Sequence, residues 1–314
     1  MWENVHTVAT PMEPGTRLVK ANCPLTPDRV LQRRYHDIVG SIGYLVQTTQ
    51  FDLAFVYGQL SQFLHNPGPV HLAAAESALA YVRGTADWGL TYYDLDADKR
   101  NVLTGWVNSD FASDSDTCRS VTGYIMSHNC APISWHSCRQ GDATLSSSEA
   151  EYIASSAVAQ PNAYLCSLLS GFDHPLLGST CVWEDTARIL ISENPVNHDQ
   201  SHHVDVKFHF FRERVRAGEI KLYKCWGHRN VADALTKSLP QPTFHKFAFH
   251  AWDSLPLSAF CSHRWLDSIL SVFLLILFLV LSCLSFSFCS RHSSFFGFAF
   301  KLCFPFSRIY FLCL

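Results

Sequence analysis

The sequence has little excess of either charge. Its 24 lysines and arginines against 27 aspartates and glutamates leave a formal net charge of −3 at pH 7. It therefore lacks the overall basic surplus of many nucleic-acid-binding proteins, and any nucleic-acid contact must come from a local patch. No Cys-x-x-Cys pair occurs among the 12 scattered cysteines, and the N-terminus has no apolar signal segment. We therefore expect free thiols in a reducing compartment.

Length and composition allow one large domain or two modest ones, since 48% of the 314 residues are hydrophobic. The pattern along the chain divides it into four segments. They are a loose leader (1–32), a helical segment (33–95), a longer unit with strands and helices (99–245), and a hydrophobic tail (258–314).

The helical segment shows apolar residues at helical spacing from Arg33 to Gly84. A turn at 66–69 (NPGP) divides the pattern, and Gly84 suits a helix end. We expect three short helices here, followed by a strand at 88–93 (WGLTYY).

The period becomes two after Asn101, which predicts three consecutive antiparallel strands at 102–111, 119–128 and 131–139. A helix is expected from about Ser147, with Pro161 kinking or dividing it. Further elements are predicted at 180–184 (strand), 186–194 (helix), 203–218 (amphipathic helix), 219–226 (strand) and 230–239 (short helix). Such an order predicts a mixed sheet with helices packed on it.

The start of the helix near Ser147 carries two carboxylates of different character. The serines at 146–148 can cap the helix, and Glu149 in its first turn suits the positive end of the helix dipole. Glu151 instead shares a helical stripe with Ala154 and Val158, which points it toward the protein. A carboxylate held against a core needs a cation.

The series of motifs is specific. It reads YHDIVGSIGYL, SQFLHNPGPVHLAAAESALAYVRGTADWGLTYY, RSVTGYI, ISWHSCRQ, LSSSEAEYIA, HHVDVKFHFFRERVRAGEI and VADALTKSLP. From about Tyr35 to Pro240 it resembles the C-terminal part of copia-type LTR-retrotransposon polyproteins. The resemblance implies the end of a reverse transcriptase followed by a ribonuclease H domain, an α/β fold with a mixed five-stranded sheet and flanking helices.

The resemblance also implies partners and a setting. No YxDD motif is present, so DNA synthesis by this chain alone is not expected. Its partners would be an RNA–DNA hybrid and other parts of the polyprotein, such as the polymerase palm and the integrase. The setting would be the cytoplasm, retrotransposon particles or the nucleus.

Ribonuclease H chemistry uses four clustered carboxylates, because two ions of Mg²⁺ or Mn²⁺ must align a water and stabilise the attacking and leaving oxygens. The resemblance assigns the four positions to Asn108, Glu151, Glu184 and Asp233. The first and the third should be aspartates, so Asn108 has lost the charge of its position, while Glu184 keeps the charge and adds a methylene. Asp110, on the same face of the strand but some 6–7 Å further on, is a substitute if the strand end bends. Asp185 is the alternate for Glu184.

Asn108 offers a carbonyl oxygen but no negative charge, so it should hold magnesium poorly. We expect a module of the type that cleaves the RNA strand of RNA–DNA hybrids, with activity impaired or absent. The alternative is a non-catalytic remnant of a transposable element that binds nucleic acid or is anchored in a membrane.

Other candidates have simple competing explanations. A basic run (Lys207, Arg212, Arg214 and Arg216) could contact hybrid phosphates, or could be the solvated face of a helix whose phenylalanines pack inward. His228, five residues before Asp233, could shuttle protons. The histidines at 198, 202, 203 and 209 match no standard zinc spacing.

The tail contains a charge-free stretch at 268–290 and more than half of the 23 phenylalanines. Its length and hydropathy make it a transmembrane candidate. A translated pyrimidine-rich non-coding stretch would have the same composition.

Overall fold

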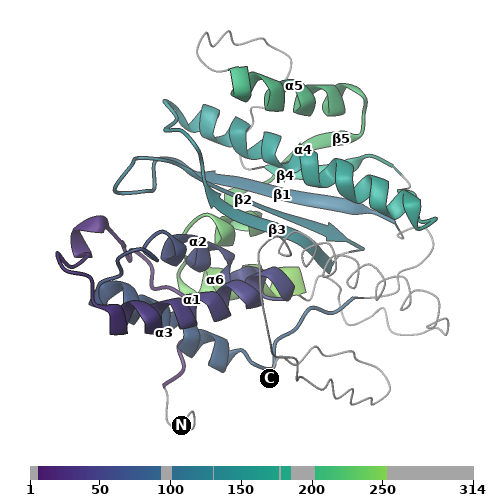
Figure 1. Cartoon of the computed structure of the whole chain (residues 1–314). Helices are drawn as coiled ribbons and strands as arrows, with labels where there is room; N and C mark the ends of the chain where they lie inside the picture. The colour runs from purple at the N-terminus through teal and green to yellow at the C-terminus, as the bar shows by residue number, and fades with distance from the viewer. Residues whose placement is uncertain (1–5, 93–100, 130, 177, 185–201, 253–314) are drawn as a thin grey trace, which may run out of the picture.

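The computed structural model describes residues 6–92, 101–129, 131–176, 178–184 and 202–252. A five-stranded sheet lies in the middle of the molecule. Helices α4 (Ser147–Gly171) and α5 (His202–Arg216) cover one face, and a group of helices from both ends of the described chain covers the other (Figure 1).

The three helices expected in the helical segment are confirmed as α1 (Arg29–Thr48), α2 (Ala54–Ser61) and α3 (Pro69–Gly84). A 3-10 turn, η2 (Phe51–Leu53), connects α1 to α2. The first helix begins four residues earlier than predicted, because the Asp28 carboxylate accepts hydrogen bonds from the amides of Val30 and Leu31 and so caps it there.

The residues before α1 are packed, contrary to the expectation of a loose leader. Met12 is buried in the core shared with the helices, and a short 3-10 turn, η1 (Lys20–Asn22), begins where the Lys20 amide donates to the Asp116 carboxylate at 2.8 Å. This contact joins the leader to the turn after the first strand.

The prediction of a strand at 88–93 is wrong: the structure describes residues 88–92 of this range, and none of them lies in a strand. Trp88 stacks edge-on against Tyr81, with ring centroids 6.4 Å apart. The Tyr92 hydroxyl donates to the Pro132 carbonyl at 2.8 Å. The aromatic residues that resemble a strand in the sequence cover the helical core instead.

The sheet confirms the expected fold class. Its strands are β1 (Leu103–Asp110), β2 (Val121–His128), β3 (Ala131–Arg139), β4 (Thr180–Glu184) and β5 (Ile220–Lys224), in the order β3-β2-β1-β4-β5. The first three pair antiparallel, while β4 pairs parallel with β1 and β5 pairs parallel with β4. The carboxyl ends of β1, β4 and β5 therefore meet at one edge of the sheet.

Successive side chains of β1 point alternately into two different hydrophobic cores. Leu103 and Val107 pack with α4 and α5, whereas Trp106 packs with the core of the helical segment. That second core also contains Ile125 of β2 and Leu235 of the turn η5 (Val231–Leu235). The helical segment and the sheet thus share one core.

Helix α4 runs through Pro161 as one element, so of the two outcomes predicted for this residue, a kink or a division of the helix, the division is wrong. Pro161 has no amide hydrogen, so it removes one backbone bond within the helix, but buried neighbours such as Val158 and Leu165 hold both halves against the sheet. Helix α6 (Gln241–Trp252), whose Phe244 and Phe247 are buried in the helical core, has no counterpart among the elements predicted from the sequence.

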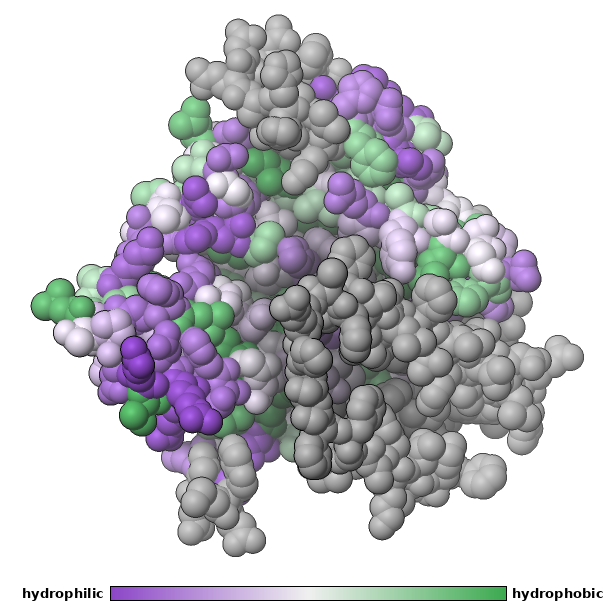
Figure 2. Space-filling model, in the orientation of Figure 1, coloured by the Kyte–Doolittle hydropathy of each residue, from purple (hydrophilic) through white to green (hydrophobic). Residues whose placement is uncertain are grey.

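Several predicted features fall outside the described residues, namely the helix at 186–194, His198, Asp185 and the tail at 258–314. Within the described part of the chain, no helix is long and apolar enough to cross a membrane. On the face seen in Figure 2, hydrophobic residues form small patches among hydrophilic ones.

Candidate functional site

Asn108, near the end of β1, forms a network of hydrogen bonds with residues of the turn η5 and just beyond it. Its Nδ2 donates to Asp233 Oδ1 at 2.5 Å and to Thr236 Oγ1 at 2.9 Å. The Thr236 hydroxyl donates in turn to the Asp233 carbonyl at 3.1 Å, so its oxygen is free to accept from Asn108. Asn108 and Asp233 are each 8% exposed.

The backbone of η5 is held tightly enough to fix this group. Asn230 donates from Nδ2 to the Val107 carbonyl at 2.9 Å, while its Oδ1 accepts from the Ala232 amide at 3.1 Å. Gly123 of β2 allows the close approach, because a Cβ there would lie 2.7 Å from the Leu235 Cβ. The sequence therefore places Asp233 beside β1 through a glycine and an asparagine.

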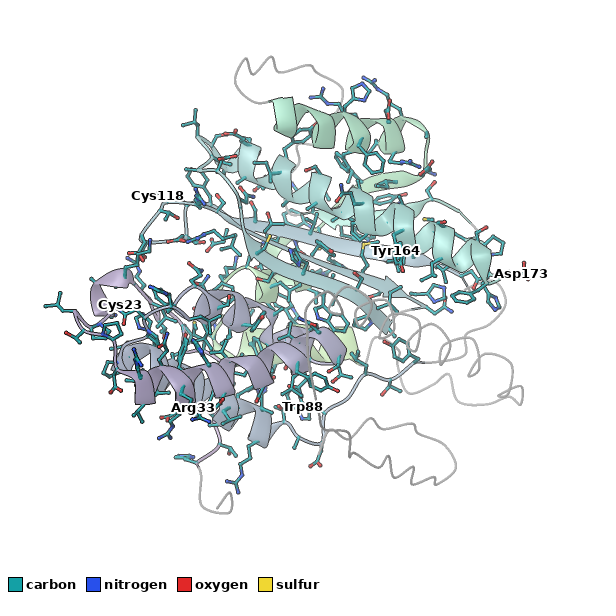
Figure 3. All side chains as sticks on the ribbon, viewed as in Figure 1. Cys23, Arg33, Trp88, Cys118, Tyr164 and Asp173 are labelled. Carbon is teal, nitrogen blue, oxygen red and sulfur yellow. The ribbon has the colours of Figure 1, made fainter. Side chains whose placement is uncertain are left out.

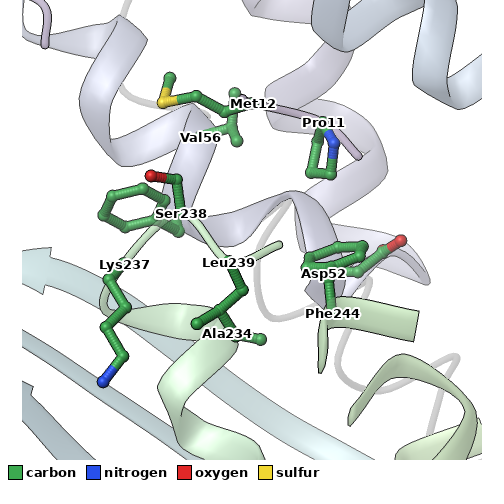
Figure 4. Close-up of a pocket in the computed structure, with 10 residues that line it drawn as sticks. Pro11, Met12, Asp52, Val56, Ala234, Lys237, Ser238, Leu239 and Phe244 are labelled. Atoms are coloured by element: carbon green, nitrogen blue, oxygen red, sulfur yellow. The ribbon is translucent and has the colours of Figure 1, made fainter. Parts of the chain in front are cut away.

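Lys237 supplies the positive charge of this group. Its Nζ lies 3.0 Å from Asp233 Oδ2, and Figure 4 shows the side chain extending toward the strands, away from Asp52. Both oxygens of Asp233 thus already have partners within the protein.

Asp110, the last residue of β1, also lies near Lys237. Burial raises the pKa of the Asp110 carboxyl, and the nearby Lys237 charge and a hydrogen bond with Ser113 partly oppose that rise.

Glu184 and Glu151 form a second acidic group on the α4 side of the sheet. The Ser155 hydroxyl of α4 donates to Glu184 Oε2 at 2.7 Å. Burial raises the pKa of Glu184; the Ser155 hydrogen bond lowers it, and the nearby Glu151 charge raises it further. Glu149 is used at the helix start, where its Oε2 accepts from the Leu145 amide at 2.8 Å.

The register shows how the two groups are related. Trp106 pairs with Trp183 in the parallel ladder, so Glu184 follows beside Val107, one residue before Asn108. Side chains alternate along β1, and Asn108 therefore points to the η5 face while Glu184 is on the α4 face. Both groups lie at the same end of the sheet.

The four candidate residues meet only part of what a site for two divalent ions requires. Glu151 and Glu184 offer two neighbouring carboxyl groups, the kind of ligand that such ions prefer. Asp233, however, is occupied by the Asn108 amide and by Lys237. Among the described residues, no three of His, Cys, Asp and Glu gather as a metal site would require.

Two of the four cations in the basic run on α5 form hydrogen bonds within the protein. Arg212 Nε donates to the Tyr152 hydroxyl at 2.7 Å. Arg214 donates to both Glu219 oxygens at 3.0 and 2.8 Å, whereas Arg216 is exposed. Phe211 packs inward and is 1% exposed, as the solvated-helix interpretation expects.

Of the remaining candidates, His209 lies 3.2 Å from Glu213 on the exposed side of α5. The side chains of Lys207, His202, His203 and His228 lie outside the described part of the structure. Sequence reasoning missed Ser155, Thr236 and Lys237. The hydrogen-bond partners of Ser155 and Thr236 come from distant elements, so the local sequence does not reveal these contacts. For Thr236 and Lys237, the one available signal is their position within VADALTK.

No family model matches the chain. It is 32% identical over 245 residues to the retrovirus-related Pol polyprotein from transposon TNT 1-94 of Nicotiana tabacum, covering 77% of this chain and 18% of that protein. The polyprotein from transposon RE1 of Arabidopsis thaliana is 32% identical, with 77% and 16% covered. The chain thus spans less than a fifth of the length of these curated relatives.

A shorter relative, the secreted RxLR effector protein 161 of Plasmopara viticola, is 37% identical over 131 residues, which are 42% of this chain and 90% of that protein. Among solved structures, LC11-RNase H1, isolated from compost, is 16% identical, with 46% of this chain and 97% of that chain covered and a TM-score of 0.32. The foamy viral protease-reverse transcriptase in complex with an RNA/DNA hybrid is 14% identical, with 46% and 21% covered and a TM-score of 0.32.

Proposed function

Because this chain belongs to the family of retrovirus-related Pol polyproteins from copia-type transposons, we propose that it is a ribonuclease H module in which cleavage of RNA–DNA hybrids is impaired. The fold and the end of the sheet that carries Asn108, Glu151, Glu184 and Asp233 support the module. The impairment is proposed from one observation, the hydrogen bond from the Asn108 amide to Asp233.

The physical argument concerns charge. Two divalent ions would align a water and stabilise the attacking and leaving oxygens of the phosphodiester. An amide NH₂ group directed at Asp233 presents positive hydrogens where a cation would need a ligand oxygen. With Lys237 on the other oxygen, both oxygens of Asp233 have partners without any ion, and an ion that binds either oxygen would compete with one of these contacts.

The acidic pair on the other side supports the same proposal. Ser155 orients Glu184 through its hydroxyl, and Glu151 is half-buried beside it. The Glu151 charge lies near enough to help raise the pKa of Glu184, so this half of the site brings together two carboxyl groups, the ligands that a hard divalent ion prefers. The proposed lesion is therefore the loss of charge at Asn108.

The test is cleavage of a hybrid labelled on its RNA strand by the full chain, in Mg²⁺ and separately in Mn²⁺. We expect weak or no cleavage by the natural sequence and clear cleavage by Asn108→Asp. Adding Glu151→Gln to that variant should abolish the activity.

Asp173→Asn is a matched control, because Asp173 is an exposed acid just beyond α4 (Figure 3). Its positive φ of 59° is one that asparagine tolerates. Cleavage by Asn108→Asp that persists with Glu151→Gln would contradict the assignment of the site, as would failure of Asn108→Asp to cleave at all.

A further inference from the structure

Three aromatic side chains gather where the edge strand β5 ends. Trp183 and Tyr223 are paired in the register of β4 and β5, and their rings lie 5.1 Å apart, inclined by 34°. Tyr223 is 39% exposed and Trp226, just beyond the strand, is 64% exposed. Lys224 Nζ lies 5.3 Å from the centre of the Trp226 ring, a cation–π contact that helps to hold the ring.

Three cations accompany these rings. Lys221 and Lys224 on β5 and Arg229 in the following turn η4 (Gly227–Arg229) are exposed. No described acid forms a salt bridge with any of them. Lys221 and Tyr223 lie on one face of β5 and Lys224 on the other, so the cations line both sides of the edge of the sheet, a local positive rim in a chain with a net charge of −3. We call Trp183, Tyr223, Trp226, Lys221, Lys224 and Arg229 the β5 strip.

The β5 strip borders the candidate site. Lys224 is the register partner of Glu184, and the Cys225 amide donates to the Glu184 carbonyl at 2.6 Å. The chain then passes through Trp226 and η4 to Asn230, which fixes Asp233 beside β1. A nucleic-acid strand at the site would have the β5 strip as its neighbour.

We propose that the β5 strip binds an unpaired nucleic-acid strand next to the hybrid, with bases stacking on Trp226 and Tyr223 and phosphates contacting Lys221, Lys224 and Arg229. The inference rests on the proposed function and extends it beyond the cleavage site. Exposed aromatic rings favour unpaired bases, because the faces of paired bases are already covered within a duplex. The cations need only a phosphate backbone and give no sequence preference.

This surface differs from the one that the sequence predicts on α5. There, Arg212 and Arg214 are held by Tyr152 and Glu219, so their binding to phosphates would cost existing contacts. The described cations of the β5 strip have no such acidic partners, and their aromatic neighbours are more exposed than the inward Phe211.

The experiment is fluorescence anisotropy with the full chain and a labelled oligothymidylate of about 12 nucleotides, within the usual site size of such surfaces. EDTA is present, so that the result does not depend on metal. Trp226→Ala should weaken binding roughly 5- to 100-fold, the usual range for one stacked base. Lys221→Ala with Lys224→Ala should reduce the slope of log K against log salt by about 1.4.

Two controls match these changes. Tyr164→Ala removes an aromatic ring that is 48% exposed on α4, and Arg33→Ala removes an exposed cation on α1 (Figure 3). Both should bind like the natural chain, and circular dichroism checks that each variant is folded. Equal binding by Trp226→Ala and Tyr164→Ala would overturn the proposal, as would equal affinity for a blunt DNA duplex.

Hybrid cleavage separates the two proposals. Cleavage by Asn108→Asp without strand binding would reject the β5 strip and leave the proposed function in place. Strand binding that depends on Trp226, without cleavage by Asn108→Asp, would reject the nuclease assignment and leave the strip as a binding surface.

Discussion

Asp52 is buried where the helical segment meets the turn that carries Asp233. It lies in η2 and is 1% exposed; its Oδ2 accepts a hydrogen bond from the Tyr81 hydroxyl, and its Oδ1 has no partner among the described groups. Asp52 lines a small cavity together with Met12, Lys237 and Phe244 (Figure 4). An ionised carboxylate in this position is poorly compensated.

The pKa of Asp52 gives the free-energy cost of ionising its carboxyl group in the folded protein. Burial raises the pKa of Asp52 from 3.8 to about 6, although hydrogen bonds from Tyr81 and from backbone amides oppose the rise. A raised pKa contributes stability that is complete below the unfolded-state value, near 4, and is lost as pH rises through about 6. Two pKa units correspond to at most about 3 kcal/mol of unfolding free energy.

Asp52→Asn keeps an oxygen that can accept from Tyr81 and removes the titration. We expect the variant to be more stable than the natural chain at pH 8, by up to about 3 kcal/mol, and nearly equal to it at pH 4. Urea unfolding followed by circular dichroism at the two pH values measures the difference. Asp37→Asn, at an exposed position on α1, is the control and should show no such dependence.

The reasoning is refuted if the gain of Asp52→Asn is the same at pH 4 and pH 8. It is also refuted if the variant is less stable than the natural chain at pH 8, since Asp52 would then be stabilised as an anion.

Three further predictions concern the same region. Asn108→Asp in a chelator should lower the unfolding free energy by about 2–4 kcal/mol, because a second buried carboxylate replaces a hydrogen bond, and millimolar Mg²⁺ should recover most of the loss in urea melts. Gly123→Ala should cost about 1–3 kcal/mol, since its Cβ would overlap Leu235; a melt that matches the natural chain's would contradict the packing. Residues 99–245 alone should lack a cooperative thermal transition in circular dichroism, because Trp106 and Ile125 would lose the helical core; a sharp transition would contradict a shared core.

Sequence periodicity predicted the elements whose burial repeats along the chain. The three antiparallel strands form where a period of two predicted them, although burial alternates only along the first part of β1. The stripe of Glu151, Ala154 and Val158 placed Glu151 on the side of α4 that faces Glu184, and Glu149 contacts the helix start. These properties depend on local spacing, which the sequence contains.

The features that the sequence did not predict depend on tertiary contacts. Trp88 and Tyr92 have the composition of a strand but find partners on α3 and β3, so they cover a core. Helix α6 is defined by its burial against the helical segment rather than by a strong pattern of its own. The roles of Thr236 and Lys237 depend on Asn108 and Asp233, which are distant in sequence and meet only in the fold.

The central claim is that the Asn108 amide closes one half of a two-ion site. The most direct measurement is a titration with Mn²⁺, followed by electron paramagnetic resonance, of the natural chain and of Asn108→Asp under the same conditions. We predict fewer than two bound ions for the natural chain and two for the variant. Two ions bound equally tightly by both proteins would contradict the account.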